Sequence, residues 1–532
     1  MCSFFFLLIL TNPILFMYGT IAEHVFIDAK NVPTPKKHRF LQKTDLGSTP
    51  RFNFKQNCLF FETFSQKTID LYKHIQIFYI FQRNYLKKAQ KKMLIEFSVE
   101  NFRSIKEKQT FSMVPSSYNK ELASDGNVKP VTSKISLLSA AAIYGANSSG
   151  KSNLLDSMGR MHNIVVNSVR INAGDPLPYE PFLLDENYAD KPTEFQATFF
   201  TNGKTYRYGF IYDKSEIKSE WLWEKTRIKE YKLFTRNGSE FSLGSRFKEG
   251  IGKEGMTTNN RLFLSLVAQL NGETSIRITY WFQKFSVISG ITNTKYRNYS
   301  IKSLLNNDNK ASALKNFLKQ MDLDFSTLKP LEQTVDESIF PANIPEVIKE
   351  KFLKEHANEK MYLLKSAHTV HHRDGTTSLQ LFDFDEMESE GTSKIFDMSG
   401  PIIDTLVNGY TLVIDELDAK LHPLLTKRIV NIFNSEKGNP HKAQLIFATH
   451  DTNLLNIDTL RRDQIWFIDK EKDDESSRLS RLSEMTIVTK NEDRKVRNDR
   501  VFEKDYLVTK LYGALPNIDE EFDLKDAMEN NA

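Results

Sequence analysis

Hydrophobic and polar positions follow strand-like patterns in the region that begins at residue 93. Met93 to Phe102 alternates like a half-buried strand, and Leu137 to Tyr144, which is apolar apart from Ser139, is typical of a buried strand. Two further runs, 194–200 and 205–212, flank a turn that contains Asn202-Gly203. Because Asn-Gly between two such runs is a strong hairpin signal, the sequence predicts an antiparallel β region here.

Further along the chain the period changes. From Asn260 to about Leu328 the apolar residues recur at helical spacing, and Ala311 to Met321 is amphipathic. Strand patterns return over Met361 to Phe384, and from Thr392 onward helix and strand patterns alternate. Alternation of this kind is typical of a parallel sheet covered by helices. We therefore predict an α/β fold.

Candidate chemistry lies directly after the apolar run that ends at Tyr144. The next eight residues fit the phosphate-loop pattern G-x-x-x-x-G-K-[S/T] at every fixed position. Glycines allow a tight turn whose N–H groups point at one anion at a helix N-terminus. Lys151 is predicted to reach the β- and γ-phosphates, and Ser152 to hold Mg²⁺. The predicted nucleotide-binding residues of this loop are Gly145, Ala146, Asn147, Ser148, Ser149, Gly150, Lys151 and Ser152.

A second part of the site is predicted where another hydrophobic run, Thr411 to Ile414, ends in two carboxylates. In a phosphate-loop enzyme this is the Walker B element, in which Asp415 would hold the same Mg²⁺. Glu416 would orient or deprotonate the attacking water. His450, which follows a buried run and lies 34 residues after Glu416, is predicted to contact the γ-phosphate. The predicted cofactors are ATP and Mg²⁺.

The two parts of this site are far apart in the sequence. Lys151 and Asp415 are separated by 264 residues, more than a compact phosphate-loop core needs. The β region and the helical region are therefore predicted to be inserted between two halves of one ATPase core. The predicted divisions are an atypical basic N-terminal extension (1–92), the first part of the ATPase head (93–170), an antiparallel β lobe (171–259), a helical insertion (260–360) and the second part of the head (361–532).

On these residues the chain resembles the ABC-type ATPases, in the branch that holds the SMC and RecF proteins and the coiled-coil break-repair ATPases. Glu100 to Ile105 is similar to the N-F-R-S opening strand of that branch, which implies that Arg103 lies at the nucleotide. The stretch 93–532, including the tail from Tyr506 to Ile518, is more specifically similar to the AAA-labelled ATPases of abortive-infection systems of the RloA and AbiL type. Despite that label, the branch is ABC-like and does not form a hexameric ring.

The resemblance also implies a signature loop, normally L-S-G-G-Q, that closes on ATP bound by another subunit. Glu388 to Ser393 is the best match, and a helix is expected from about Lys394. An ordinary helix N-cap is the alternative interpretation. Asp418 matches the D-loop at the dimer face, and a Gln for the Q-loop is not identifiable. The implied signature residues are Ser389, Gly391 and Thr392.

For function, the resemblance implies a homodimer or higher homo-oligomer that ATP binding closes and hydrolysis opens. It implies the ATPase component of an anti-phage, abortive-infection defence system that acts through a separate effector of the RloB type. DNA or a phage component is a further candidate partner. Two alternatives stay open: a RecF-like DNA repair ATPase, and an ATP-gated sensor or scaffold with negligible turnover.

Charge and cysteine content set residues 1–92 apart from the rest. This segment has 14 Lys and Arg against 5 Asp and Glu, and it holds both cysteines. We expect the natural protein to start at Met93; the alternative is a basic, aromatic-rich arm that touches nucleic acid or a membrane surface.

Residues 93–532 have 58 basic against 63 acidic residues and no cysteine. The lack of cysteine excludes disulfides and thiolate metal sites there, and predicts a cytoplasmic location. The acidic balance argues against tight DNA binding by bulk charge. No apolar run in this part is long enough to span a bilayer, so no membrane partner is predicted.

Overall fold

A computed structural model describes residues 92–116, 125–226, 229–291, 294–306, 309–323, 328–337, 340, 344–356, 359–488, 493–496, 501–507 and 515. All of them belong to one of the chain's two units, Gln82–Ala532. The predicted extension up to residue 91, with both interpretations of it, lies outside the described residues. So does the predicted tail, apart from Tyr506, Leu507 and Leu515.

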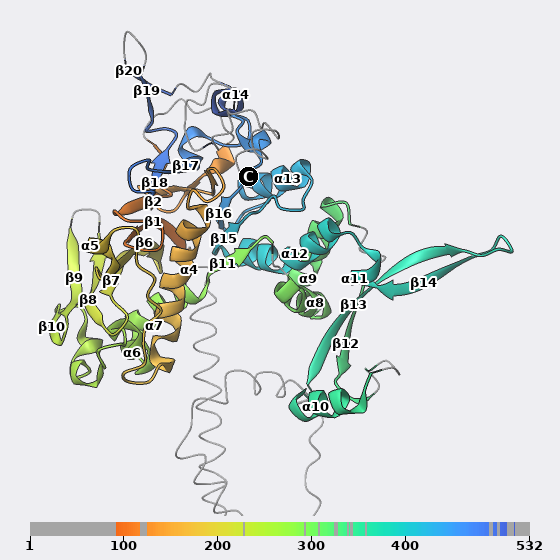
Figure 1. Cartoon of the computed structure of the whole chain (residues 1–532), viewed down its shortest axis with the longest axis horizontal. Coiled ribbons are helices and arrows are strands. Elements are labelled where there is room, and N and C mark those ends of the chain that lie inside the picture. Colours follow the sequence, from red (N-terminus) through yellow and green to blue (C-terminus); the bar gives the residue numbers. More distant parts are fainter. Residues whose placement is uncertain are drawn as a thin grey trace, which may run out of the picture. The chain divides into compact units, whose positions relative to one another are not determined.

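A mostly parallel sheet forms the centre of this unit (Figure 1). Its strands lie in the order β11 (Phe285–Ser289), β15 (Thr411–Asp415), β16 (Gln444–Ala448), β5 (Ala140–Tyr144), β17 (Ile465–Lys470) and β18 (Ser477–Arg481). Neighbours run parallel except for β17 and β18, which are antiparallel. The chain therefore enters this sheet at β5, within the sheet, and continues at the edge strand β11. It reaches β17 and β18, on the other side of β5, last.

Side chains along β5 show why the central strands are apolar throughout. Ala141 and Ile143 belong to one hydrophobic core, whereas Ala140, Ala142 and Tyr144 belong to another. Successive side chains of a strand point to opposite faces, and both faces of this sheet are covered.

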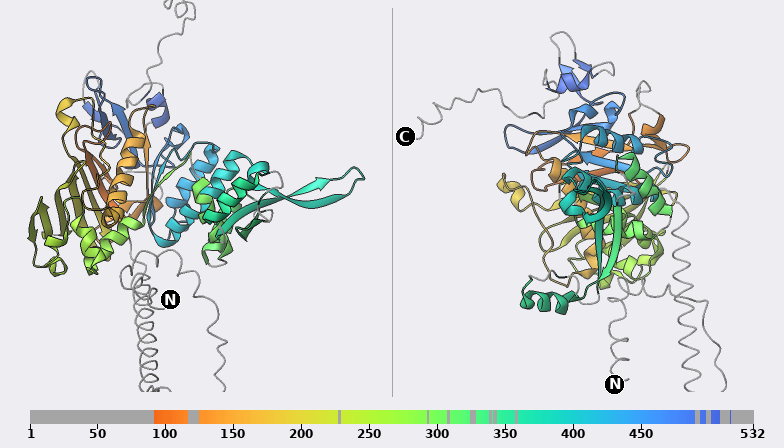
Figure 2. Two further views of the ribbon diagram at one scale, coloured as in Figure 1. Left: turned by 60° about the horizontal axis from the view of Figure 1, so that its bottom comes forward. Right: turned by 90° about the vertical axis from the view of Figure 1, so that its right-hand side faces the viewer.

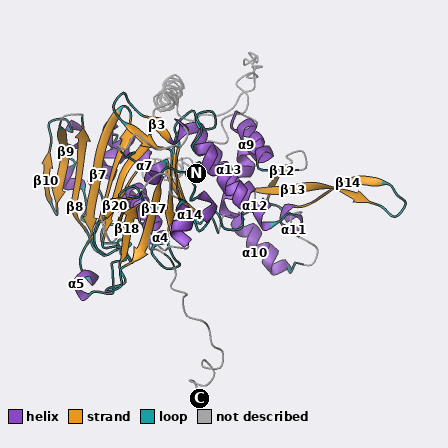
Figure 3. Ribbon diagram, turned by 90° about the horizontal axis from the view of Figure 1, so that it is seen from above, coloured by secondary structure: helices purple, strands orange, loops and turns teal. Residues whose placement is uncertain are grey.

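An antiparallel sheet, drawn with orange strands in Figure 3, has residues in the first of these cores. Its strands lie in the order β10 (Glu240–Leu243), β9 (Glu230–Asn237), β8 (Ile217–Lys225), β7 (Lys204–Tyr212), β6 (Thr193–Thr201), β1 (Met93–Glu100) and β2 (Gln109–Ser112). Asn202 and Gly203 join β6 to β7 with φ angles of 53° and 78°, as a tight hairpin turn requires. The predicted antiparallel region is confirmed, and the first strand of the chain's described part belongs to it.

Helices cover both faces of the parallel sheet. On one side, α4 (Lys151–Asn167) packs with α7 (Glu273–Gln283), and α6 (Phe263–Gln269) packs with α7. On the other, α8 (Arg297–Leu305), α9 (Asn309–Gln320) and α12 (Glu390–Asn408) pack against one another (Figure 2, green to cyan). The core on this side also contains residues of α13 (Pro423–Phe433) and α14 (Phe502–Leu507). This arrangement confirms the predicted α/β class.

Smaller elements complete the described part. An antiparallel sheet pairs β12 (Leu328–Thr334), β13 (Lys360–His371) and β14 (Thr377–Asp383), as Figure 1 shows. The remaining described strands and α-helices are β3 (Val128–Pro130), β4 (Ser136–Leu138), β19 (Thr486–Val488), β20 (Asp493–Lys495), α5 (Glu186–Ala189), α10 (Glu346–His356) and α11 (Phe384–Met387). Among the described helices, each is too short or too polar to span a bilayer.

Some local predictions were wrong. The segment 285–289, expected to be helical, is β11, because its β-branched Val287 and Ile288 pair along the buried strand β15. The apolar run 137–144 is divided at Ser139, whose hydroxyl hydrogen-bonds to Asn434 Oδ1 at 2.6 Å. Helix α12 begins at Glu390, one turn earlier than expected.

Gln444 on β16 connects the parallel sheet to β1. Its Oε1 accepts from Leu94 N–H at 2.7 Å, and its Nε2 donates to the carbonyls of Leu94 (3.0 Å) and Leu138 (3.2 Å). The pairing of β1 with β6 shifts register between Leu94 and Glu96. A bulge of this kind leaves backbone groups without ladder partners. The fully buried Gln444 amide satisfies those of Leu94.

We predict that Gln444→Met lowers the free energy of unfolding by about 2–3 kcal/mol, because it leaves buried backbone groups unsatisfied. Urea unfolding of the full chain, followed by circular dichroism, measures the change. Gln380→Met on the exposed face of β14 is the matched control and should shift stability by less than about 0.5 kcal/mol. Equal unfolding midpoints for the two variants would contradict this role of Gln444.

Candidate nucleotide site

The predicted phosphate loop joins β5 to α4. Gly150 caps the helix with φ 110° and ψ 10°, a left-handed conformation that glycine adopts without strain. Ser148 also has a positive φ, 63°. Gly150 has a second reason to lack a side chain, because an added Cβ would lie 2.1 Å from Ser477 Oγ. The turn therefore leads directly into the N-terminus of a long helix, the geometry that binds phosphate.

Lys151 points back over this loop. Its Nζ donates to the carbonyls of Gly145 (2.8 Å) and Ala146 (3.0 Å), and its side chain is buried. Burial lowers the pKa of Lys151, while the nearby carboxylates of Asp415, Glu416 and Asp418 act to raise it. The structure thus brings the predicted lysine and the predicted acidic residues together.

The sheet order explains how this happens. β16 lies between β5 and β15, and all run parallel, so their carboxyl ends meet at one edge. The Ser152 hydroxyl lies near enough to the Asp415 carboxylate to act on its pKa. Burial raises the pKa of Asp415, and Ser152 and Lys151 oppose that rise.

These oxygens suit a Mg²⁺ ion. Asp415 Oδ1 is buried and has no hydrogen-bond partner among the described residues. Within the same residues no group of His, Cys, Asp and Glu forms a protein-only metal cluster. Mg²⁺ typically takes one or two protein oxygens and completes its shell with phosphate and water. The Ser152 hydroxyl and the Asp415 carboxylate fit that pattern.

Glu416, Asp418 and His450 lie in loops that hydrogen-bond to one another. Glu416 follows β15 with φ 53°, and Leu417 N–H donates to the carbonyl of Ala448 at 3.1 Å. The His450 backbone N–H donates to Asp418 Oδ2 at 3.2 Å. Burial and the Lys151 charge lower the pKa of His450, so its imidazole is neutral near pH 7 and can accept or donate a hydrogen bond.

Arg103 is engaged by carboxylates. Its Nη1 forms an ion pair with Asp156 on α4 at 2.6 Å, and its Nε pairs with Glu180. These pairs hold the guanidinium beside the helix that starts at the phosphate loop. Direct contact of Arg103 with a nucleotide would require exchange of these partners and stays a prediction.

The signature residues lie at the start of α12. Ser389 is the N-cap, and its Oγ accepts from Thr392 N–H at 3.1 Å. The capping alternative is therefore what the structure shows, and it explains why the helix begins at Glu390. Gly391 lies in the first turn, where an added Cβ would come 2.8 Å from the carbonyl oxygen of Lys420. A role for these residues at another subunit's phosphate stays a prediction.

Sequence reasoning missed a polar network that supports the loop from behind. Ser477 Oγ hydrogen-bonds to Ser149 O (2.7 Å) and to Ser104 Oγ (2.8 Å), and Asn153 Nδ2 donates to Ser104 Oγ at 2.7 Å. Ser104 was visible in the N-F-R-S motif, but it was not assigned to the site. Ser477, on β18, belongs to no motif, so only the folded chain reveals its contact with the loop.

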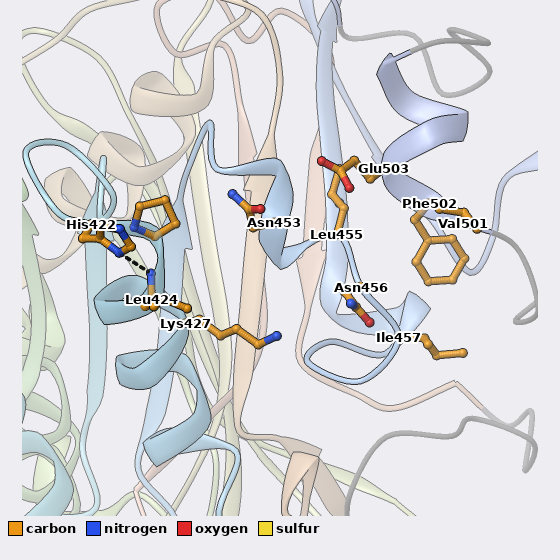
Figure 4. A pocket seen from close by; sticks show the side chains of 11 residues that line it. His422, Leu424, Lys427, Asn453, Leu455, Asn456, Ile457, Val501, Phe502 and Glu503 are labelled. Atoms are coloured by element: carbon orange, nitrogen blue, oxygen red, sulfur yellow. Dashed lines mark hydrogen bonds between the residues drawn. The ribbon is translucent and has the colours of Figure 1, made fainter. Parts of the chain in front are cut away.

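A cavity of about 570 Å³ lies beside the N-terminus of α13 (Figure 4). His422, Lys427, Asn453 and Glu503 are among its lining side chains, and His422 Nδ1 accepts from Leu424 N–H at 3.2 Å. None of the predicted nucleotide residues is among its described lining residues. The cavity is therefore separate from the phosphate loop.

Comparison with known proteins places the chain in a family. Residues 140–456 match the family described as "AAA domain, putative AbiEii toxin, Type IV TA system", and the chain belongs to it. No curated protein matches the chain. The chain therefore carries an AAA domain over these residues.

Solved structures with detectable similarity include heads of SMC proteins and RecF. The SMC head bound to the C-winged helix domain of ScpA has 13% identity and a TM-score of 0.36, covering 73% of this chain and 97% of that chain. The SMC head domain from Thermotoga maritima has 11% identity and a TM-score of 0.32, covering 73% and 98%. RecF with ATP has 14% identity and a TM-score of 0.27, covering 68% and 94%.

We predict that Gly150→Ala weakens ATP binding at least about tenfold, because the left-handed backbone disfavours a side chain and the Cβ meets Ser477. Titration with a fluorescent ATP analogue measures the dissociation constant. Gly174→Ala is the matched control: Gly174 also has positive φ, 88°, but an added Cβ there meets no atom within 4 Å. If both variants bind ATP like the wild type, the loop assignment is wrong.

Proposed function

We propose that this chain binds ATP with Mg²⁺ and hydrolyses it to ADP and phosphate, acting as a switch. The observation that carries the proposal is the meeting of Lys151, Ser152 and Asp415 at the edge formed by β5, β16 and β15. Phosphate-loop enzymes place a lysine, a hydroxyl and a carboxylate in this arrangement.

Each residue then has a defined task. The loop N–H groups and the α4 N-terminus bind the β- and γ-phosphates, and Lys151 exchanges its loop carbonyls for phosphate oxygens. Ser152 and Asp415 hold Mg²⁺, which neutralises phosphate charge. Glu416 orients the attacking water or accepts its proton, and neutral His450 hydrogen-bonds to the γ-phosphate.

We further propose that two chains act together as a homodimer or higher homo-oligomer. The α12 N-terminus, with Ser389, Gly391 and Thr392, would approach the nucleotide of another subunit, where free helix N–H groups favour an anion. Asp418 would lie at the same interface. ATP binding would close the subunits, and hydrolysis would release them.

We predict that Glu416→Gln lowers kcat at least about 100-fold while ATP binding is kept, because it removes the carboxylate that acts on water. Phosphate release by the full chain gives kcat, and light scattering gives the mass with ATP. Glu346→Gln, a surface carboxylate on α10, is the control and should hydrolyse like the wild type. EDTA should stop hydrolysis by the wild type.

The same experiment separates the alternatives. Stimulation of hydrolysis by DNA ends or gaps would favour a RecF-like repair ATPase. Tight ATP binding with turnover far below about 1 s⁻¹ would favour a sensor or scaffold. A wild-type chain that does not bind ATP would overturn the proposal.

We propose a cytoplasmic role in anti-phage defence through a separate effector protein of the RloB type. Its support is the family description, which names AbiEii and a toxin–antitoxin system, and the similarity to abortive-infection ATPases described above. An ATP-driven opening and closing would release or restrain such an effector.

For this role we predict that bacteria carrying the gene with its neighbours yield fewer phage than bacteria without them, and that Lys151→Ala abolishes the difference. Phage yield per infected cell is the measurement, with Lys349→Ala on α10 as the control that keeps protection. Equal yields with and without the wild-type gene would contradict the defence role and leave the ATPase proposal standing.

A further inference from the structure

Lys394 on α12 is a buried ammonium held by backbone carbonyls. Its side chain is almost completely buried, with a relative exposure of 1%. Nζ donates to the carbonyl oxygens of Glu416 (3.1 Å), Leu417 (2.9 Å) and Ala419. A buried charge is tolerated when several acceptors converge on it, as they do here. The carbonyls all belong to the turn that directly follows the Walker B strand.

This turn has a conformation that needs support. Glu416 has φ 53°, Lys420 has φ 61°, and Ala419 N–H donates to the carbonyl of Glu416 at 3.3 Å. Three carbonyls of this turn accept from Lys394 Nζ, and a charged donor stabilises acceptors that converge in this way. Because the side chains of Glu416 and Asp418 project from the turn, its position sets theirs.

The first turn of α12 contacts the same segment at further points. Gly391 approaches so closely that an added Cβ would lie 2.8 Å from the carbonyl oxygen of Lys420. Lys420 Nζ also forms an ion pair with Glu390 at 3.2 Å. The helix N-terminus and the turn 416–420 are therefore in contact along their length, with Lys394 as the buried part of that contact.

We propose that Lys394 is a positioning residue for ATP hydrolysis: it fastens the turn 416–419 to α12. In the proposed dimer, the α12 N-terminus contacts the nucleotide of the other subunit. Glu416 acts on the water that attacks the nucleotide of its own subunit. Movement of α12 onto the partner's phosphate would then place Glu416 at the same time, and the two sites would act cooperatively. This inference rests on the proposed function.

The test compares the full-length wild type with Lys394→Met, which keeps the length of the side chain and removes its charge and donors. We expect ATP to bind with unchanged affinity, kcat to fall roughly 10- to 100-fold, and the ATP dependence of the rate to lose its cooperativity. Lys310→Met is the matched control. Lys310, on α9, forms an ion pair with Asp404, which lies on α12 away from the turn. It should retain the wild-type kcat and cooperativity.

The other results are equally decisive. A folded Lys394→Met variant with wild-type kcat and cooperativity would overturn the inference. So would a parallel loss of ATP affinity and kcat, since that indicates a general structural role. If Lys394→Met does not fold, Lys394→Gln takes its place: it has no charge and only two donor hydrogens for the three carbonyls, so it should show the same separation of kcat from affinity. A wild type that binds ATP without hydrolysing it would overturn the proposed function first, and this inference with it.

Discussion

The structure depends on how one buried ammonium, that of Lys151, is accommodated at the edge of the parallel sheet. The side chain is removed from water, and its charge is balanced by the carbonyls of Gly145 and Ala146 and by carboxylates beyond them. A buried charge without such partners would be strongly unfavourable. The acidic residues must therefore lie opposite the loop, and the sheet order β15-β16-β5 places them there.

The phosphate loop has polar contacts both behind it and in front of it. Behind the loop, Ser477 Oγ hydrogen-bonds to the Ser149 carbonyl and to Ser104 Oγ, and these contacts hold the turn from that side. In front of it, Asp415 Oδ1 is left without a partner among the described residues, and Lys151 rests on carbonyls that a phosphate can replace. In the proposed mechanism, polar groups arranged in this way would stabilise the phosphate electrostatically.

The site also depends on contacts between segments that are far apart in the sequence. Gln444 joins β16 to β1 through the backbone of Leu94, so the antiparallel sheet and the parallel sheet share a core. On the opposite face, Lys394 connects α12 to the turn after β15. A change in either sheet or in α12 can therefore reach Asp415, at the end of β15, and Glu416 in the turn that follows it.

The sequence by itself determined the local parts: the phosphate loop, the apolar strands that precede it and Asp415, the Asn202-Gly203 hairpin and the α/β class. These depend on spacing and on turn residues, which act over a few positions. It did not determine the strand order, the strand at Phe285–Ser289, the start of α12 or the contacts of Ser477 and Lys394. Only the tertiary structure decided these, because pairing partners hundreds of residues apart, and the burial they create, leave no signal in a short stretch of sequence.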